Sequence, residues 1–206
     1  RVMYRAFFFL IIVGGMQIVL TAFFASLVSL LITVLLVLAM LAARQVMVQN
    51  LLVLMAIAGI GLVIGLSITP LIAVGALLIL SFYDIIAVYV TRHMVRMAEG
   101  MVDAGAIFGF IVPFEFSGLR EKIERVKPGD KFMILGSGDI ALPLILATSA
   151  VRVSTTHAWL VALFSVVGLF ITHLLFVNQK QRRPMAALPP IAMMAIVGYL
   201  VAISIL

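Results

Sequence analysis

Seven apolar runs, each about 20 residues long, dominate this sequence. A run of that length can cross the hydrocarbon core of a bilayer as a helix. Hydrophobic residues make up 65% of the 206 residues and charged residues only 11%, a composition far from that of soluble globular domains. The runs fall near residues 4–25, 26–43, 47–66, 70–92, 131–151, 156–178 and 185–206. They predict an all-α polytopic membrane protein with seven spans.

The first two runs are joined without any turn signal. No charged residue occurs between positions 6 and 43, and one helix over that stretch would be roughly 57 Å long, nearly twice the hydrocarbon core. A turn must therefore interrupt it, yet Phe24-Ala25-Ser26-Leu27 contains no Gly, Pro or polar cluster. We expect that residues, up to whole helices, are absent from this chain near residue 25.

Charge divides the chain into three parts. Residues 1–92 and 131–206 are apolar, whereas residues 93–130 form a charged loop that contains one apolar run, Ala106 to Phe116, expected to lie against the membrane interface. Threading the spans alternately places every Lys and Arg except Arg152 on one side. The positive-inside rule then predicts a cytoplasmic N-terminus and loop and an external C-terminus. It also accounts for the net charge of +6 without a nucleic-acid partner.

Only two acidic residues, Asp84 and Asp139, lie within the predicted spans. A charged side chain at that depth costs several kcal/mol, so each marks a candidate functional site. Asp84 precedes Arg92 by eight residues and Asp139 follows Lys131 by eight. If both segments are helical, each carboxylate lies roughly 12 Å in from the same face. Two antiparallel spans can therefore bring these carboxylates together.

Two carboxylates a few ångströms apart in a low dielectric cannot both ionise easily, so they share one proton. One then acts as a base that activates water, and the other acts as an acid that polarises a peptide carbonyl, without a covalent intermediate. Gly136 and Gly138 fit this use because they remove side chains beside Asp139. The alternative is a structural Asp–Asp hydrogen bond combined with close helix packing.

Small residues and prolines suggest two further features. The spacing of Gly61 and Gly65 allows a close helix approach, and we expect it to serve packing. Pro189 and Pro190 permit two interpretations. They leave backbone carbonyls unpaired, which could pair with an unwound peptide as an added strand, or they occupy the first turn of the last helix.

Taken together, these motifs resemble the presenilin and signal peptide peptidase family of intramembrane aspartyl proteases, most closely its microbial presenilin homologues. The resemblance covers roughly residues 47–206 and rests on Tyr83-Asp84, on Gly136-Ser137-Gly138-Asp139 after a large loop, and on Ala187-Leu188-Pro189 at the start of the last run. Ala186 departs from the family, which has Pro at the first position of the last motif. The family has nine spans, against the seven counted here.

The resemblance implies a presenilin-like helical bundle that hydrolyses peptide bonds within transmembrane helices. It implies that Asp84 and Asp139 are catalytic, with no metal and no cofactor. It also implies partners: transmembrane segments as substrates and the lipid bilayer of a prokaryotic plasma membrane. A homo-oligomer is compatible with it. The residues expected to bind substrate or support the site are Tyr83, Gly136, Ser137, Gly138, Ala187, Leu188 and Pro189.

Two other functions use similar residues. Paired intramembrane carboxylates also form proton relays and cation sites, so an ion-coupled transporter or channel is one alternative. A prepilin-peptidase-like enzyme, which shares Gly-x-Gly-Asp but cuts just outside the bilayer, is another. A zinc metalloprotease is not supported, because His93, His157 and His173 are scattered and no His-Glu-x-x-His sequence occurs. The Gly-x-Ser-Gly sequence of a rhomboid-like serine protease is also absent.

Overall fold

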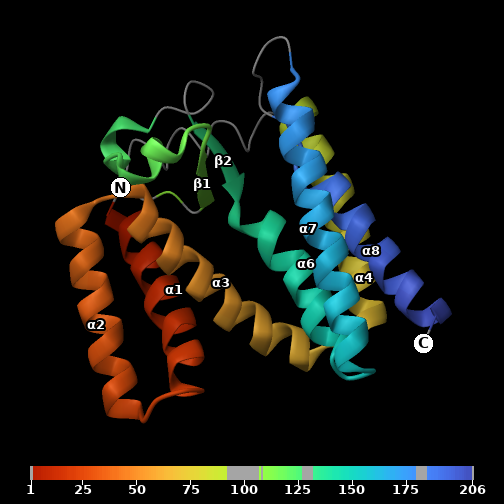
Figure 1. Ribbon diagram of the computed structural model, residues 1–206, viewed down its shortest axis with the longest axis horizontal. Helices are drawn as coiled ribbons and strands as arrows, with labels where there is room; N and C mark the ends of the chain where they lie inside the picture. Colours follow the sequence, from red (N-terminus) through yellow and green to blue (C-terminus); the bar gives the residue numbers. More distant parts are fainter. Residues whose placement is uncertain (1, 92–106, 108, 127–131, 180–184, 206) are drawn as a thin grey trace. The chain divides into compact units, whose positions relative to one another are not determined.

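The structure, a computed structural model, describes residues 2–91, 107, 109–126, 132–179 and 185–205 (Figure 1). Seven α-helices occur in this part of the chain. Their bounds are α1 Val2–Thr21, α2 Ser26–Ala43, α3 Val46–Ser67, α4 Pro70–Ile85, α6 Ser137–Ala150, α7 Thr155–Val177 and α8 Leu188–Ile205. A π-helical turn, Ile86–Val90, continues α4. Strands β1 (Gly109–Pro113) and β2 (Phe132–Gly136) form an antiparallel pair, and two 3₁₀ turns cover Phe116–Arg120 and Ile123–Arg125.

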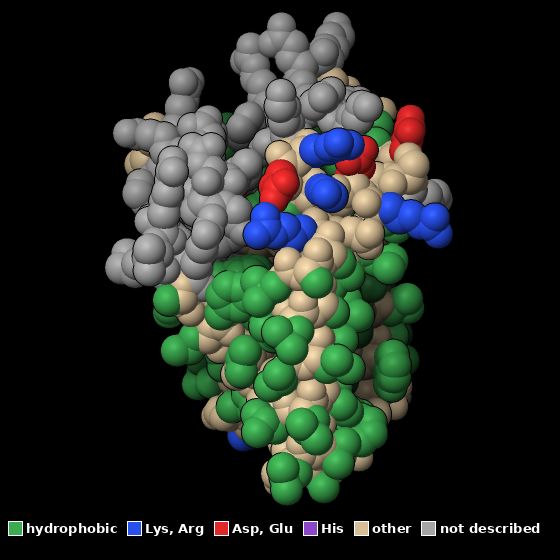
Figure 2. All heavy atoms as spheres, turned by 90° about the vertical axis from the view of Figure 1, so that its left-hand side faces the viewer, with side chains coloured by type: hydrophobic (Ala, Val, Ile, Leu, Met, Phe, Trp, Pro, Cys, Tyr) green, Lys and Arg blue, Asp and Glu red, His purple; other side chains and the backbone are tan. Residues whose placement is uncertain are grey.

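The helices confirm the predicted all-α polytopic class. Five helical segments of the described chain are long and apolar enough to cross a membrane. Two further apolar helices are shorter: Ala6–Thr21, which is part of α1, and Ser137–Ala150, which is α6. These seven helices correspond to the seven predicted apolar runs. On the face drawn in Figure 2, hydrophobic side chains cover the helices and charged side chains gather at one end. Leu27 and Leu35 of α2 are 75% and 68% exposed, as expected for side chains that contact lipid.

The chain forms two compact units. Unit 1 comprises Arg1–Ile60 with Arg96–Ser137, and unit 2 comprises Gly61–Val95 with Gly138–Leu206. In unit 1, α1 and α2 form a hairpin whose turn, Ala22 to Ala25, is closed by backbone hydrogen bonds such as Phe24 N–H to Leu20 O at 2.9 Å. The turn thus forms without Gly or Pro. The expectation that residues are absent at this point stays a prediction.

Buried polar side chains hold the α1–α2 hairpin in register. The Gln17 amide donates from Nε2 to Ser29 Oγ at 2.8 Å and accepts at Oε1 from Thr33 Oγ1 at 3.0 Å. Ser29 and Thr33 are almost completely buried. Within a bilayer, hydrogen bonds of this kind join helices that have no hydrophobic preference for each other over lipid.

The strand pair of unit 1 is attached to helix α3 by side-chain amides. Asn50 donates to Ile111 O at 2.7 Å and accepts from Ile111 N–H at 2.9 Å, so its amide takes the place of a neighbouring strand beside β1. Gln49 donates to Ile107 O at 3.1 Å. A small buried cluster of Val46, Ile107, Ile111, Val126 and Phe132 fills the space beneath.

Replacing Asn50 with leucine should therefore detach the strand pair from α3. The change keeps the side-chain volume but leaves the buried N–H and C=O of Ile111 without partners, each at a cost of about 1–3 kcal/mol. We expect lower thermal stability and faster proteolysis around β1. Leu51→Ala, at a half-exposed neighbouring position on α3, is the control. An Asn50→Leu protein as stable as wild type would show that these hydrogen bonds add nothing.

One boundary predicted from the sequence is wrong. Residues 131–136 were expected to begin the fifth span as a helix, but Phe132–Gly136 is strand β2, and α6 starts at Ser137. All five residues pair with β1, from Gly109 opposite Gly136 to Pro113 opposite Phe132, so the backbone hydrogen-bonding groups find partners without a helix. The depth estimated for Asp139 from a helical rise after Lys131 therefore does not apply.

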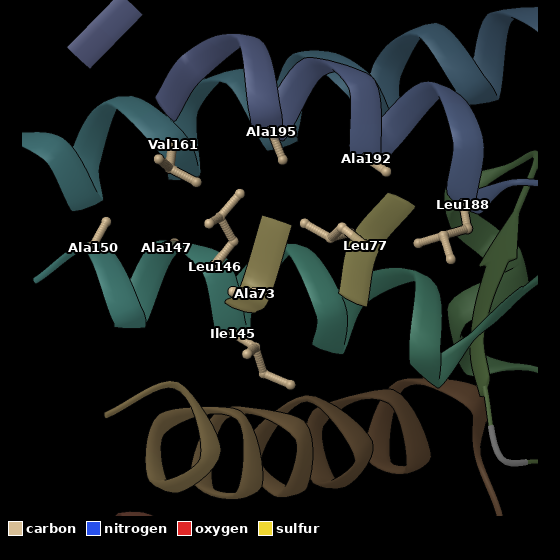
Figure 3. Close-up of a cluster of buried hydrophobic side chains, with 10 residues drawn as sticks. All are labelled: Ala73, Leu77, Ile145, Leu146, Ala147, Ala150, Val161, Leu188, Ala192 and Ala195. Carbon is tan, nitrogen blue, oxygen red and sulfur yellow. The ribbon is translucent and has the colours of Figure 1, made fainter. Parts of the chain in front are cut away.

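Unit 2 is a helical bundle around a single core. Helices α7 and α8 pack along each other, and α4 packs on α8. Leu77 of α4, Leu146 of α6 and Leu188 of α8 belong to one buried cluster, and Figure 3 shows Leu77 and Leu146 between the ribbons of α6 and α8. The core therefore binds the helix that carries Asp84 to the helix that carries Asp139.

The end of α3 also belongs to unit 2, and the close helix approach predicted at Gly61 and Gly65 is made with α6. A Cβ added at Gly65 would overlap Thr148 Oγ1 and lie 2.8 Å from Ile145 O, and one added at Gly61 would lie 2.8 Å from Leu144. Thr148 Oγ1 donates to Gly61 O at 3.2 Å. Arg152, the one basic residue assigned to the opposite side of the membrane, donates to Leu66 O near the end of α3.

Candidate active site

Asp84 lies on the inward face of α4, near the point where the α-helix changes to a π-helical turn. Its inward neighbours on the helix, Ala73, Leu77 and Val88, are buried, and Asp84 itself is only 6% exposed. Turns of π-helix inside longer helices occur frequently at functional sites. The carboxylate therefore sits in an apolar environment within a locally irregular helix.

Asp139 occupies the first turn of α6, directly after strand β2. It is also 6% exposed. Strand β2 ends at Gly136 and α6 begins at Ser137, so the chain changes from strand to helix between these two residues. Gly138 borders open space, since a Cβ added there would have no heavy atom within 4 Å. Another chain could therefore approach the backbone beside Asp139.

A main-chain group of α8 binds the first aspartate. The Leu188 N–H donates to Asp84 Oδ2 at 3.3 Å. Leu188 begins α8, and the next two residues, Pro189 and Pro190, have no N–H, so Leu188 carries the single amide donor among the first three residues of the helix. The positive end of the helix dipole adds to this interaction with the carboxylate.

The other predicted site residues differ in their burial and in their position on the helices. Ala187 is buried beside Leu188, and Pro189 and Pro190 lie in the first turn of α8, as in the second interpretation of these prolines. Ser137 is the first residue of α6 and is half-buried. Tyr83 is 59% exposed, so it points away from the inward face that carries Asp84.

Sequence reasoning missed two groups next to Asp84. The Leu188 N–H carries no side-chain signal, although the Pro-Pro pair that follows it indicates a helix start. Ser81 lies three residues before Asp84, a spacing that places both on one helix face. Among the described residues, no group of three His, Cys, Asp or Glu side chains could hold a metal ion.

Asp84 and Asp139 are buried on two helices of the same bundle, an arrangement that an aspartyl protease within a membrane would require. A family model for signal-peptide peptidase and presenilin aspartyl proteases matches residues 1–206, and the chain belongs to that family. It is therefore an intramembrane peptide hydrolase of the aspartic type. No curated protein matches the chain.

Two solved structures are similar to this chain, and each is described as a presenilin family intramembrane aspartate protease. The structure in space group C222 is 25% identical, covers 94% of this chain and 69% of its own, and has a TM-score of 0.61. The structure in space group P2 is 27% identical, covers 99% of this chain and 72% of its own, and has a TM-score of 0.62. These matches favour the protease over the transporter and the prepilin-peptidase-like enzyme.

Proposed function

We propose that Asp84 and Asp139 are the catalytic pair of this protease and that it cuts peptide bonds within transmembrane segments of other membrane proteins. The observation that carries the proposal is the burial of both carboxylates in unit 2. No other acidic residue lies within a predicted span. Burial gives each carboxylate a low-dielectric environment, in which two neighbouring carboxyl groups share one proton.

The reaction needs only these two groups and water. The ionised carboxylate takes a proton from water while the water oxygen adds to the peptide carbonyl carbon, and the protonated carboxyl group donates its proton to the carbonyl oxygen. Collapse of the tetrahedral intermediate breaks the C–N bond: the amine leaves with a proton from one carboxyl group, and a hydroxyl of the gem-diol returns its proton to the other carboxylate. The Leu188 N–H fixes one oxygen of Asp84 during these transfers.

Substrate handling follows from the same groups. A transmembrane helix hides its peptide bonds, so the substrate must unwind beside the aspartates, and the open space next to Gly138 accommodates its backbone. Supporting roles fall to the predicted residues Tyr83, Gly136, Ser137, Gly138, Ala187, Leu188 and Pro189. The excess of Lys and Arg on one side supports a cytoplasmic loop 93–130 and an external C-terminus. The resemblance to microbial presenilin homologues supports a prokaryotic plasma membrane. Preferred substrates then have external N-termini, and a homo-oligomer stays a prediction.

The decisive experiment is the cleavage of a single-span substrate by purified protein in liposomes, with mass spectrometry of the products. The double variant Asp84→Asn/Asp139→Asn is the blank. Products that end inside the span and are absent from the blank support the proposal. Cuts confined to residues outside the bilayer would favour the prepilin-peptidase-like enzyme. A proton or cation flux without any product would favour the transporter.

Leu188→Pro tests the main-chain donor to Asp84. Proline fits the first position of a helix but removes the N–H. Loss of a hydrogen bond to a charged group, worth about 1.5–3 kcal/mol, should lower kcat by at least about tenfold. Leu188→Met keeps the N–H and an apolar side chain and should retain activity. Equal kcat values for the two variants would show that this hydrogen bond does not assist catalysis.

A further inference from the structure

Two buried side-chain polar atoms have no hydrogen-bond partner among the described residues: Ser81 Oγ and His157 Nδ1. His157 lies in the first turn of α7, which follows the end of α6 opposite to Asp139. Ser81 lies on α4, three residues before Asp84. Its position one helical turn from Asp84 makes it the more informative of the two.

The Ser81 hydroxyl behaves differently from other hydroxyls on the helices. A serine or threonine within a helix commonly donates to the carbonyl one turn earlier. Examples among the described residues are Ser67 to Val63 O at 2.6 Å, Ser165 to Val161 O at 2.7 Å and Thr172 to Gly168 O at 2.9 Å. Ser81 makes no such bond in the described part of the chain, although its Oγ is buried.

Ser81 also shares the inward face of α4 with the catalytic carboxylate. Leu77, one turn earlier, is 1% exposed, and Asp84, one turn later, is 6% exposed. Residues three and four apart on a helix are neighbours on its surface. Ser81 and Asp84 therefore lie one helical turn apart on the buried face of α4.

Asp84 has acceptor capacity left. Its Oδ2 receives the Leu188 N–H, and no donor among the described residues is assigned to Oδ1. Hydrolysis requires a water molecule at the carboxylates, and a water molecule in a buried site needs two to four polar partners. Asp84 Oδ1 and Ser81 Oγ would supply two of them within an otherwise apolar stripe.

We propose that Ser81 Oγ and Asp84 bind one water molecule between them, and that Ser81 is a water-positioning residue for peptide hydrolysis. The role of this water rests on the proposed function of Asp84, and Ser81 itself forms only hydrogen bonds. The hydroxyl holds the oxygen beside the carboxylate that takes its proton. It does not contribute to binding of the substrate helix.

The kinetic test compares Ser81→Ala, Ser81→Thr and Ser165→Ala. Loss of the hydroxyl in Ser81→Ala should lower kcat by roughly tenfold, the value of one hydrogen bond to a reacting group, with KM unchanged. Ser81→Thr restores the hydroxyl and should restore kcat. Ser165→Ala removes a buried hydroxyl on α7 that already has a partner, and kcat should not change. An unchanged kcat in Ser81→Ala, or an equal loss in Ser81→Thr, overturns the proposal.

A second measurement is independent of catalysis. The chain has no cysteine, so Ser81→Cys and Leu77→Cys are single-cysteine proteins one helical turn apart. We expect a small water-soluble thiol reagent to modify the Ser81→Cys protein and not the Leu77→Cys protein. Equal protection of both variants overturns the proposal. If the reagent modifies position 81 but the wild-type protein cleaves no substrate, the water site is supported and the proposed function is wrong.

Discussion

Replacement of either Asp84 or Asp139 by asparagine is expected to lower peptide cleavage by about 10³-fold or more, because in the proposed mechanism each carboxylate transfers protons in both halves of the reaction. Asparagine keeps the size of the side chain and removes a carboxylate from an apolar environment. Each variant should therefore be at least as stable as wild type, and the lost activity cannot be attributed to unfolding. Initial rates of product formation, with the melting temperature of each variant, give the measurement.

The matched control is Glu124→Gln, which makes the same carboxylate-to-amide change at an exposed position. Glu124 pairs with Arg44 at 2.6 Å, with both side chains more than half exposed, and such pairs contribute little. Its activity should equal that of wild type. If one of the two aspartate variants kept a tenth of the wild-type rate, the shared-proton mechanism would be wrong and the remaining aspartate would have to act alone.

The second large effect is expected at Gly65, where α3 meets α6. Gly65→Leu places a side chain where the first carbon already overlaps Thr148 Oγ1 and lies 2.8 Å from Ile145 O, a backbone atom that cannot rotate away. Overpacking of this kind costs roughly 3 kcal/mol. We expect a clear fall in thermal stability. Cleavage activity should fall with it, because α6 carries Asp139.

Gly75→Leu is the control for this substitution. Gly75 is also within a helix, but a Cβ added there meets no heavy atom within 4 Å. Replacing glycine by leucine at an open helical position should stabilise the helix by up to about 1 kcal/mol. Opposite signs of the two changes are expected in a thermal denaturation series in one detergent. Equal stability of the two proteins would show that α3 and α6 separate readily.

The two catalytic candidates could be found from the sequence because an acid within an apolar run is visible without any structure. Gly61 and Gly65 were also predictable, since their spacing places both on one face of a helix. Strand β2 was not: Phe132-Met-Ile-Leu135 is a short apolar run, and periodicity cannot distinguish a buried strand from part of a helix. Its partner strand β1 lies more than 15 residues earlier, within the charged loop.

Groups that act through the backbone or through one remote contact stayed hidden as well. Asn50 is a polar residue in an apolar run, and nothing in the sequence indicates that its amide pairs with Ile111. The unpaired hydroxyl of Ser81 becomes visible only when the other helix hydroxyls are found to have partners. Such groups depend on which atoms the fold leaves without a neighbour, and a linear pattern does not contain that information.

The donor to Asp84 is a peptide N–H, and this has a consequence for the variation of the last motif. Nineteen of the twenty amino acids would supply the same N–H at position 188, so the interaction does not depend on the identity of one side chain. Ala186, where the family has proline, lies outside the hydrogen bond and can differ without disturbing it. Side chains of the motif can therefore be substituted while the peptide N–H still interacts with Asp84, as long as the helix continues to begin at the same residue.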